Sequence, residues 1–409
     1  MRAFDVFINQ TRAGTLAEDS HGRILFRLAA DYVRLPRRPV LSQSFEDDLQ
    51  KSYGSKPGRL PAFFANLVPE GALRELLFRS LSIDKEDEMG LLAAAGSDLP
   101  GGVILKEAVS AQIVEENEVP FEELHEGEET GSQVGLRFSL AGIQLKFSMI
   151  RDEGRLSLPA RQGEEGHWIV KFPSRRFPRL PENEYAILSW AIACGFRVPD
   201  IFLALSESLP PRLRDHVPEG EKLLVVRRYD RRLSLRVHQE DFAQAVGLHP
   251  EQKYGFTYER CAALVRAVAG DDQLIEFVRR LAFMVACGNS DAHLKNWSFL
   301  YEDPAMPILS PLYDQVATVA WKEMRPPSTG LKLDGQRSMN MLSAASFGRL
   351  AERIGVAPNP IQDAVNETLQ RARTSALGGA LANLPESHGR ALRDHWKNVP
   401  LLRSIGSLS

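Results

Sequence analysis

The residues whose types and spacing could do the most specific chemistry lie in the polar segment 288–296, GNSDAHLKN. This segment follows the apolar end of a predicted helix, so its polar side chains should emerge together in an exposed loop. Asp291 and Asn296 are five residues apart, and Lys295 lies between them. In phosphoryl transfer an aspartate orients the attacking hydroxyl and an asparagine at this spacing holds Mg²⁺, while a lysine could screen phosphate charge. The segment predicts a phosphoryl-transfer loop, with a polar turn between a helix and a strand as the alternative.

A second acidic residue, Asp314, ends the tetrapeptide Pro-Leu-Tyr-Asp at 311–314, after the apolar stretch 306–309. An aspartate at the end of a strand, shortly after the first loop, fits the second metal-binding aspartate of phosphoryl transfer. Carboxylate and amide oxygens are suitable ligands for Mg²⁺. Asp314 would complete a magnesium site of two carboxylates and one amide with Asp291 and Asn296. On its own, an aspartate before a turn is ordinary.

Lys171 lies inside the predicted strand 167–173, between apolar neighbours. Burial of a lysine is costly unless the ammonium group is paired or binds an anion. Glu184 can supply the pair, because it shares a face of the predicted helix 183–194 with apolar residues. A strand lysine followed by a helix glutamate is the pair that grips the α- and β-phosphates of ATP in protein kinases. The alternative is an edge-strand lysine whose ammonium group reaches water.

Two further segments gain interest from their position in the chain. The turn 139–146, SLAGIQLK, precedes Lys171 at the place of a loop that covers ATP phosphates, but its single glycine matches neither the Walker nor the kinase glycine-rich pattern. The strand 223–229 becomes polar where two lobes would join, so the backbone of Arg227 and Tyr229 could meet an adenine edge. An ordinary hairpin and a charged surface turn are the respective alternatives. Along the chain the order is a phosphate-covering loop, a lysine, a helix glutamate, a hinge, a loop with Asp and Asn, and a second metal-binding aspartate. This is the order of these features in a bilobal kinase.

The composition argues against several classes of protein, among them nucleic-acid-binding, disulfide-rich, zinc-binding and membrane proteins. Of 409 residues, 50 are Lys or Arg and 53 are Asp or Glu, so with a net charge of −3 the chain is a poor candidate for binding nucleic acid unaided. Its three cysteines, Cys194, Cys261 and Cys287, are far apart and predict neither a disulfide scaffold nor a zinc site. The start lacks the apolar core of a signal peptide, and the apolar runs are too short to span a bilayer. A soluble cytoplasmic protein with no membrane contact is therefore expected.

The elements that must position these residues divide the chain into four segments. Residues 1–106 are predicted to form a small α+β unit. Residues 107–134 form an acidic linker, because nine glutamates occur there without a lysine or arginine among them. Residues 135–238 are strand-rich with one helix, and residues 239–409 are helical. The predicted fold is α+β and bilobal, like that of a protein kinase, with a strand-rich N-lobe that carries the extra N-terminal subdomain and an all-helical C-lobe.

Hydrophobic periodicity and turn residues set the expected bounds of individual elements. A polar turn ending at Gly14 should follow the first strand. Strands are expected at 4–8, 24–28, 137–141, 146–151, 167–173, 201–205 and 223–229, and helices at 72–80, 86–95, 183–194, 239–246, 258–269 and 273–287.

Taken together, these motifs resemble the HipA family of bacterial type II toxin-antitoxin serine/threonine kinases. The NSDxHxKN loop at 289–296 and the Leu-Tyr-Asp element ending at Asp314 are the specific parts of the resemblance. Two positions depart from the family pattern, since Leu145 stands where Glu or Pro is common and Arg227 where the hinge often has an acidic residue. Supporting matches along the chain are 63–71 (FFANLVPEG), 139–146, 183–185 (NEY), 229–231 (YDR) and 239–241 (QED).

The resemblance implies an ATP- and Mg²⁺-dependent serine/threonine protein kinase that inhibits growth by phosphorylating a translation-related protein, such as an aminoacyl-tRNA synthetase. It implies that Asp291 is the catalytic base and that Asn296 and Asp314 hold Mg²⁺. It also places an autophosphorylation site at Ser139, where a phosphate would add negative charge and repel ATP. The residues expected to bind ATP are Lys171, Glu184, Arg227, Tyr229, Ala141, Gly142, Lys146, His293 and Lys295.

The resemblance further implies a partner, a HipB-like helix-turn-helix antitoxin that contacts operator DNA. Since this chain has no clear helix-turn-helix and no basic excess, DNA should be reached only through that partner. Two other functions stay open: a small-molecule or lipid kinase on the same fold, and a non-catalytic co-repressor that bridges DNA-bound antitoxins. The set of Asp291, Asn296, Asp314 and Lys171 argues against the co-repressor, because a scaffold needs no magnesium site.

Overall fold

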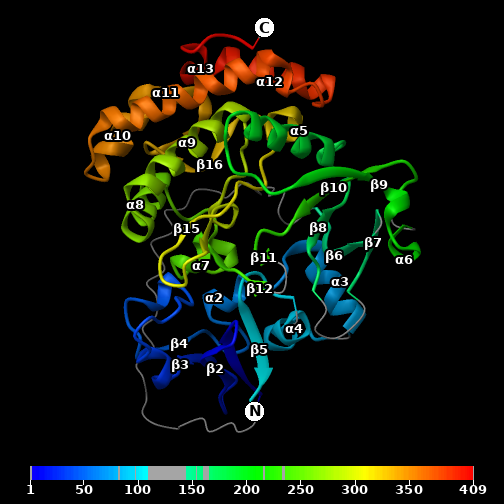
Figure 1. Cartoon of the computed structure of the whole chain (residues 1–409), viewed down its shortest axis with the longest axis vertical. Helices are drawn as coiled ribbons and strands as arrows, with labels where there is room; N and C mark the ends of the chain where they lie inside the picture. Colours follow the sequence, from blue (N-terminus) through cyan, green and yellow to red (C-terminus); the bar gives the residue numbers. More distant parts are fainter. Residues whose placement is uncertain are drawn as a thin grey trace.

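The structure is a computed structural model, and it describes residues 2–81, 83–96, 98–108, 144–152, 154–159, 165–214, 217–232 and 235–408. Figure 1 shows the N-terminal unit at one end of the molecule and the C-terminal helices at the other. The strand expected at 137–141 and most of the acidic linker lie outside the described residues. None of the described helices combines the length and the apolar character that crossing a membrane requires.

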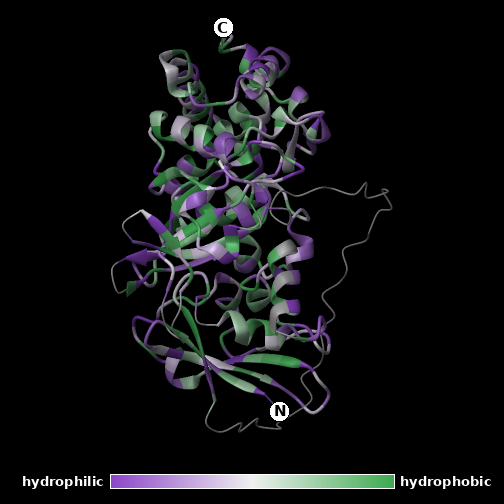
Figure 2. Ribbon diagram, turned by 90° about the vertical axis from the view of Figure 1, so that its right-hand side faces the viewer, coloured by the Kyte–Doolittle hydropathy of each residue, from purple (hydrophilic) through white to green (hydrophobic). Residues whose placement is uncertain are grey.

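The N-terminal unit is built on a five-stranded antiparallel sheet with the strand order β4-β3-β2-β1-β5. Its elements are β1 (Ala3–Ile8), β2 (Thr11–Glu18), β3 (Ile24–Leu28), β4 (Ser52–Gly54), β5 (Val103–Glu107), α1 (Ala30–Val33), α2 (Ala62–Ala65), α3 (Gly71–Leu81) and α4 (Glu88–Ala95). Alternate strand residues such as Val6, Leu16 and Phe26 are buried in a core that belongs to this unit alone. Figure 2 shows the hydrophobic strands of this sheet in green, near the N-terminus.

One expectation for this unit is wrong. Gly14 does not end a polar turn, because it lies inside β2 and the chain already turns at Asn9 and Gln10. Asn9 has φ 54°, a left-handed conformation that asparagine tolerates better than most residues. Glycine is required at position 14 because a Cβ there would lie 2.2 Å from the carbonyl oxygen of Arg27 on the neighbouring strand.

A second antiparallel sheet, in the order β7-β6-β8-β10-β9, forms the strand-rich lobe. Its elements are β6 (Lys146–Asp152), β7 (Arg155–Ser157), β8 (Trp168–Lys171), β9 (Ile201–Leu205), β10 (Lys222–Arg227), α5 (Leu180–Ala193) and α6 (Pro211–Arg214). Lys146 lies directly opposite Lys171, so both side chains are on the same face of the sheet. Helix α5 packs Leu188 against β10 and buries Trp190 in the core of the C-lobe, which joins this sheet to the C-lobe.

The C-lobe has an extensive hydrophobic core around α9. Its helices are α7 (Phe242–Ala245), α8 (Tyr258–Ala269), α9 (Asp271–Cys287), α10 (Ala344–Arg353), α11 (Pro358–Ser375), α12 (Glu386–Asn398) and α13 (Pro400–Arg403). Residues 281–287, the last part of α9, are fully buried. The loop 289–296 therefore begins at the end of a helix that is fixed by packing on all sides.

The C-lobe is not all-helical, contrary to expectation. Strands in this lobe are β13 (His238–Asp241), β14 (Ser298–Tyr301), β15 (Ile308–Leu309), β16 (Ser328–Leu333) and β17 (Gln336–Ser338). The helix expected at 239–246 begins only at Phe242, because residues 239–241 pair with β14. Asp241 then caps α7, since its carboxylate accepts a hydrogen bond from the Gln244 N–H at 2.9 Å.

The remaining expected elements of the described residues are confirmed, with differences of a few residues at their ends. A small hairpin of β11 (Arg231–Arg232) and β12 (Leu235–Arg236) follows the second sheet. The division into residues 1–106, 107–134, 135–238 and 239–409 stays a prediction.

The N-terminal unit contacts the C-lobe directly. The Ser42 hydroxyl donates to Glu240 Oε2 at 2.6 Å, and Gln244 Nε2 donates to the Phe63 carbonyl oxygen at 3.1 Å. Glu240 is fully buried, so this contact is part of the interior and not a loose association. The contact places Phe63 beside α7 of the C-lobe.

Candidate active site

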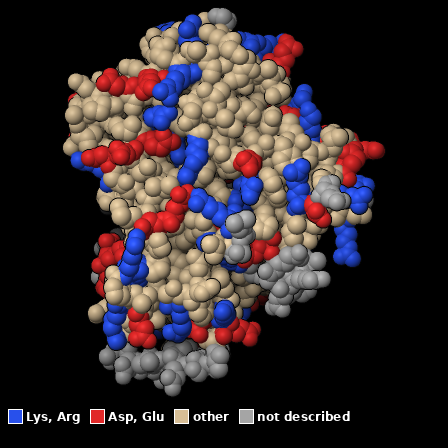
Figure 3. Space-filling model, in the orientation of Figure 1, with Lys and Arg blue, Asp and Glu red and all other residues tan. Residues whose placement is uncertain are grey.

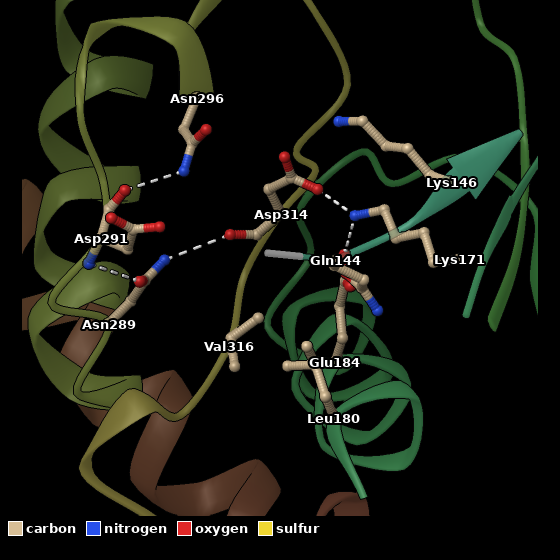
Figure 4. Close-up of a pocket in the computed structure, with 10 residues that line it drawn as sticks. All are labelled: Gln144, Lys146, Lys171, Leu180, Glu184, Asn289, Asp291, Asn296, Asp314 and Val316. Carbon is tan, nitrogen blue, oxygen red and sulfur yellow. Dashed lines mark hydrogen bonds and ion pairs between the residues drawn. The ribbon is translucent and has the colours of Figure 1, made fainter. Parts of the chain in front are cut away.

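A cavity lies between the second sheet and the C-lobe. Figure 4 shows its side chains converging from β6, β8, α5, the loop after α9 and the segment after β15. Six residues predicted from the sequence line it: Lys146, Lys171, Glu184, Asp291, Asn296 and Asp314. The other lining residues are Gln144, Leu180, Asn289 and Val316.

The loop that carries Asp291 leaves α9 through a sharp turn at Gly288, which has φ 67°. A Cβ at this position would also lie 2.8 Å from the side chain of Val319, so glycine is required for two reasons. The turn directs the loop towards the cavity immediately after the buried helix. Asn296 Nδ2 donates to the backbone oxygen of Asp291 at 2.9 Å, which holds the two predicted residues together.

Asn289 joins the two loops of the site, although no role was predicted for it. Its Oδ1 accepts a hydrogen bond from the Asp291 N–H at 3.0 Å, and its Nδ2 donates to the Asp314 carbonyl oxygen at 3.2 Å. Both bonds are drawn in Figure 4. An asparagine two residues before an aspartate is a signal for a side-chain-to-backbone turn. Nothing local in the sequence indicates the second bond, because Asp314 is distant in the chain.

Lys171 makes two ion pairs in the cavity. Its Nζ lies 2.5 Å from Glu184 Oε1 and also contacts Asp314 Oδ1. Burial lowers the pKa of Lys171, but the carboxylates of Asp314 and Glu184 outweigh burial and raise that pKa above its usual value. The ammonium group therefore stays charged. Burial raises the pKa of Glu184, although Lys171 acts in the opposite direction. The strand lysine and helix glutamate are paired as predicted, with Asp314 as a third member.

Asp314 has φ 51°, an uncommon value for a residue other than glycine. Such conformations persist only where the surroundings hold them, and they cluster at functional sites. Here Asn289 binds the carbonyl oxygen of Asp314, and Lys171 binds its carboxylate. Burial raises the pKa of Asp314, but Lys171 and Lys146 lower it below its usual value, so the carboxylate is ionised at neutral pH.

The donor set of the cavity fits Mg²⁺. Asp291, Asn296 and Asp314 offer two carboxylates and an amide oxygen, and sites of this ion commonly combine one or two carboxylates with substrate phosphates. Across the part of the chain that the structure describes, no group of three or more His, Cys, Asp or Glu side chains is arranged to hold a metal ion. A metal in this cavity would therefore need nucleotide phosphates or water among its ligands.

Lys295 and His293 were expected to bind ATP, but neither lines the cavity. Lys295 Nζ lies 2.9 Å from Asn66 Oδ1 and 3.2 Å from Glu70 Oε1, both in the N-terminal unit. His293 is fully buried, and its ring packs edge-on against Tyr254 with 5.1 Å between the centroids. Burial lowers the pKa of His293 to about 3, so the ring is neutral at physiological pH. Loop spacing placed both residues in the right loop but could not tell which side each faces.

Arg227 and Tyr229 lie at the connection between the lobes, and they too are absent from the cavity lining. The Arg227 N–H donates to the Asp200 carbonyl oxygen at 2.8 Å, so Arg227 could offer only its carbonyl oxygen to an adenine edge. The Arg227 guanidinium group is exposed and lies 3.4 Å from the Asp200 carboxylate. The predicted contacts of Arg227 and Tyr229 with adenine stay predictions.

Ser139, Ala141 and Gly142 lie outside the described residues, so their roles stay predictions as well. The described end of the same segment reaches the site. Gln144 lines the cavity, and its Nε2 donates to the Phe172 carbonyl oxygen at 3.0 Å.

Two known protein-family domains match this chain. Residues 4–106 match the HipA N-terminal domain, and residues 138–376 match the HipA-like C-terminal domain. This chain belongs to the HipA family. The membership expected from the motifs is therefore confirmed.

Relatives in the HipA family align with most of the chain. It is 33% identical to Y4dM of Sinorhizobium fredii over 381 residues, and this alignment covers 90% of each of the two chains. It is 29% identical over 381 residues to Y4mE of the same organism, which covers 87% of this chain and 86% of the relative. Both relatives carry provisional names as kinases. The serine/threonine-protein kinase toxin HipA of Shewanella oneidensis is 24% identical over 342 residues, covering 74% of this chain and 72% of the relative.

A solved structure shares the fold of this HipA family member. It is a chain in the complex of the Shewanella oneidensis MR-1 toxin-antitoxin system, HipA and HipB with operator DNA. The two structures have a TM-score of 0.73 over 98% of this chain and 99% of that chain, at 19% sequence identity. This likeness confirms the predicted bilobal, kinase-like α+β fold.

Proposed function

We propose that this chain is an ATP- and Mg²⁺-dependent serine/threonine protein kinase and the toxin of a toxin-antitoxin system. The observation that carries the proposal is the convergence of Lys171, Glu184, Asp291, Asn296 and Asp314 around one cavity. These residues come from separate parts of the sequence, yet together they provide a charged lysine, a carboxylate for the acceptor hydroxyl and metal ligands. The name of the Shewanella oneidensis relative, a serine/threonine-protein kinase toxin, supports the same activity.

Each residue has a defined task in this proposal. Lys171, held by Glu184, binds the α- and β-phosphates of ATP. Asp314 and Asn296 hold Mg²⁺, which when bound neutralises charge on the phosphates. Asp291 accepts the proton of the acceptor hydroxyl. The serine or threonine oxygen then bonds to the γ-phosphorus as the bond from phosphorus to the ADP oxygen breaks.

The test is transfer of labelled phosphate from γ-labelled ATP in the presence of Mg²⁺. Purified wild type and Asp291→Asn are compared, alone and with cell lysate, after melting curves have checked that both are folded. Label on the wild-type chain or on a discrete lysate protein, and none with Asp291→Asn, is the expected result. If neither chain transfers label and mass spectrometry finds no phosphate already on Ser139, the kinase proposal fails.

The proposed partner is a HipB-like helix-turn-helix antitoxin, and DNA is reached through it. The solved complex of HipA and HipB with operator DNA supports this partner. Figure 3 shows acidic and basic side chains interspersed over one face of the molecule, which does not favour direct DNA binding by that face. Coexpression with a HipB-like antitoxin should relieve growth inhibition, and operator binding should require the antitoxin.

The proposed substrate is a translation-related protein in the cytoplasm, such as an aminoacyl-tRNA synthetase, on the basis of the family resemblance. Induced wild type should stop growth, and Asp291→Asn should not. If Asp291→Asn is equally toxic, phosphorylation is not the cause of toxicity.

Autophosphorylation at Ser139 is the proposed regulation. A phosphate there would bring roughly two negative charges close to the phosphates of ATP and weaken nucleotide binding. Ser139→Ala should remove self-labelling, and labelling that persists would assign the modified residue elsewhere.

A further inference from the structure

Tyr254 follows the short 3-10 turn Pro250–Gln252 and contacts residues 289–296, the proposed catalytic loop, without lining the cavity. Its hydroxyl donates a hydrogen bond to Asp291 Oδ1 at 2.5 Å. Asp291 is only 3% exposed and does line the cavity, so the tyrosine holds one oxygen of a carboxylate that belongs to the site. We propose that Tyr254 is a positioning residue that fixes the orientation of the Asp291 carboxylate for phosphoryl transfer. This inference rests on the proposed kinase function.

The backbone around Tyr254 is tied to its surroundings on two sides. The Lys253 carbonyl oxygen accepts a hydrogen bond from the Leu294 N–H at 3.2 Å, and the Tyr254 carbonyl oxygen accepts one from Arg337 Nη2 at 2.8 Å. The Tyr254 ring also packs against the buried His293 ring. A hydroxyl on a rigid ring with a fixed backbone has little freedom of position. Its hydrogen bond therefore sets the carboxylate orientation and does not merely follow it.

Two contacts restrain Asp291 in complementary ways. Asn289 holds the backbone, because its Oδ1 accepts from the Asp291 N–H, and Tyr254 holds the side chain. A carboxylate with one oxygen in a fixed hydrogen bond cannot rotate freely about its Cβ–Cγ bond. Its second oxygen then has a set direction, which matters because a base must meet the acceptor hydroxyl at hydrogen-bond distance.

Tyr258 offers a matched comparison in the same region. Its hydroxyl donates to the carbonyl oxygen of Ala292 at 2.8 Å, one residue after Asp291, and its side chain is fully buried. Trp297 Nε1 also approaches this carbonyl oxygen, at 3.5 Å. Loss of the Tyr258 hydroxyl would remove a bond to the backbone of the loop and leave the carboxylate untouched.

The test compares Tyr254→Phe and Tyr258→Phe with the wild-type chain. Transfer from γ-labelled ATP to casein gives kcat and KM for ATP, and melting curves check folding. Tyr254→Phe is expected to lower kcat about tenfold, because it loses one hydrogen bond to a charged group. Its KM for ATP should change less than about twofold, since the nucleotide contacts are intact. Tyr258→Phe should keep kcat within about twofold of the wild type.

Three outcomes overturn the positioning role. They are a Tyr254→Phe chain as fast as the wild type or faster, an equal loss of kcat in both variants, and a Tyr254→Phe chain that does not fold. In each of these the wild type is active. A wild type that labels neither casein, nor itself, nor any lysate protein overturns the proposed kinase function together with this inference, so the two failures are distinguishable.

Discussion

The ammonium nitrogen of Lys295 lies 3.2 Å from Glu70 Oε1, and this contact joins the catalytic loop to the N-terminal unit. Asn66 of the same unit contacts the same ammonium group through its Oδ1, at 2.9 Å. Lys295 immediately precedes Asn296, the proposed magnesium ligand. The N-terminal unit is therefore part of what holds the catalytic loop in place, although the cavity itself is lined by residues from later in the chain.

Replacement of Glu70 by glutamine should destabilise the protein. Glu70 pairs with Lys253 at 2.7 Å and with Lys295 at 3.2 Å, and the two lysine side chains are only 10% and 14% exposed. A neutral glutamine would leave two largely buried ammonium groups without this carboxylate. We expect the free energy of unfolding to fall by about 3 kcal/mol, as measured by urea denaturation.

Glu251→Gln is the matched control for this change. The pair Arg59–Glu251 joins the same two parts of the molecule at 2.8 Å, but its side chains are 39% and 66% exposed. An exposed pair of this kind contributes less than about 1 kcal/mol. Equal losses of stability in Glu70→Gln and Glu251→Gln would contradict a special role for the buried pairs.

The stabilisation by Glu70 should disappear in acid. Burial raises the pKa of Glu70, but Lys295 and Lys253 outweigh burial and lower it to about 2, from an ordinary value of 4.5. Because the folded pKa is the lower one, the stabilisation is complete above pH 4.5 and is lost as the pH falls towards 2. Asp241 and His293 also face Glu70 and the two lysines. Because both residues are present in the wild type and in Glu70→Gln, they do not account for a difference between the two proteins. Urea titrations should show the difference between wild type and Glu70→Gln shrinking over this interval; a constant difference would refute the assignment.

Local sequence patterns predicted several elements of the fold. The strands 24–28 and 201–205 and the helix 258–269 have the predicted bounds, because short apolar runs mark the strands and apolar residues recur with the helical period in 258–269. Lys171 and Glu184 were found for a related reason: a charge inside an apolar pattern must have a partner if the pattern is buried.

Contacts between distant segments could not be predicted in this way. Lys295 was expected to face ATP phosphates, but its orientation depends on Glu70, which no local pattern connects to it. The same holds for the bond of Tyr254 to Asp291. Strand β13 depends on pairing with β14, so the helix expected from residue 239 begins only at Phe242. Sequence periodicity reports which residues are buried, while tertiary contacts decide what they meet.

Lys171→Met should weaken nucleotide binding far more than Lys146→Met. The two lysines face each other across β6 and β8, but Lys171 is buried between Glu184 and Asp314, whereas Lys146 is exposed. Loss of Lys171 would remove the proposed phosphate contact and leave the carboxylates of Glu184 and Asp314 close together without their cation. We expect a fluorescent ATP analogue to bind at least about tenfold more weakly to Lys171→Met, and at most about threefold more weakly to Lys146→Met. An equal effect of both changes would show that the Lys171 ion pairs do not serve nucleotide binding.

Gly330→Ala should disturb the catalytic loop through its backbone. Strand β16 approaches the loop so closely at Gly330 that a Cβ there would lie 2.6 Å from the carbonyl carbon of Ala292 and 2.7 Å from its oxygen. A side chain could rotate away from such a contact, but these are backbone atoms directly after Asp291, so the strand or the loop must shift. We expect a loss of about 1–3 kcal/mol in the free energy of unfolding and a kcat lowered at least about tenfold.

Gly378→Ala is the control for this last change, because a Cβ at Gly378 would meet nothing within 4 Å. It should leave kcat unchanged and alter stability by no more than about 0.5 kcal/mol. Urea denaturation measures the stability of the wild type, Gly330→Ala and Gly378→Ala, and phosphate transfer measures the kcat of each. If Gly330→Ala resembles Gly378→Ala in both measurements, the catalytic loop can shift without loss of function, and the close contact with β16 does not constrain Asp291.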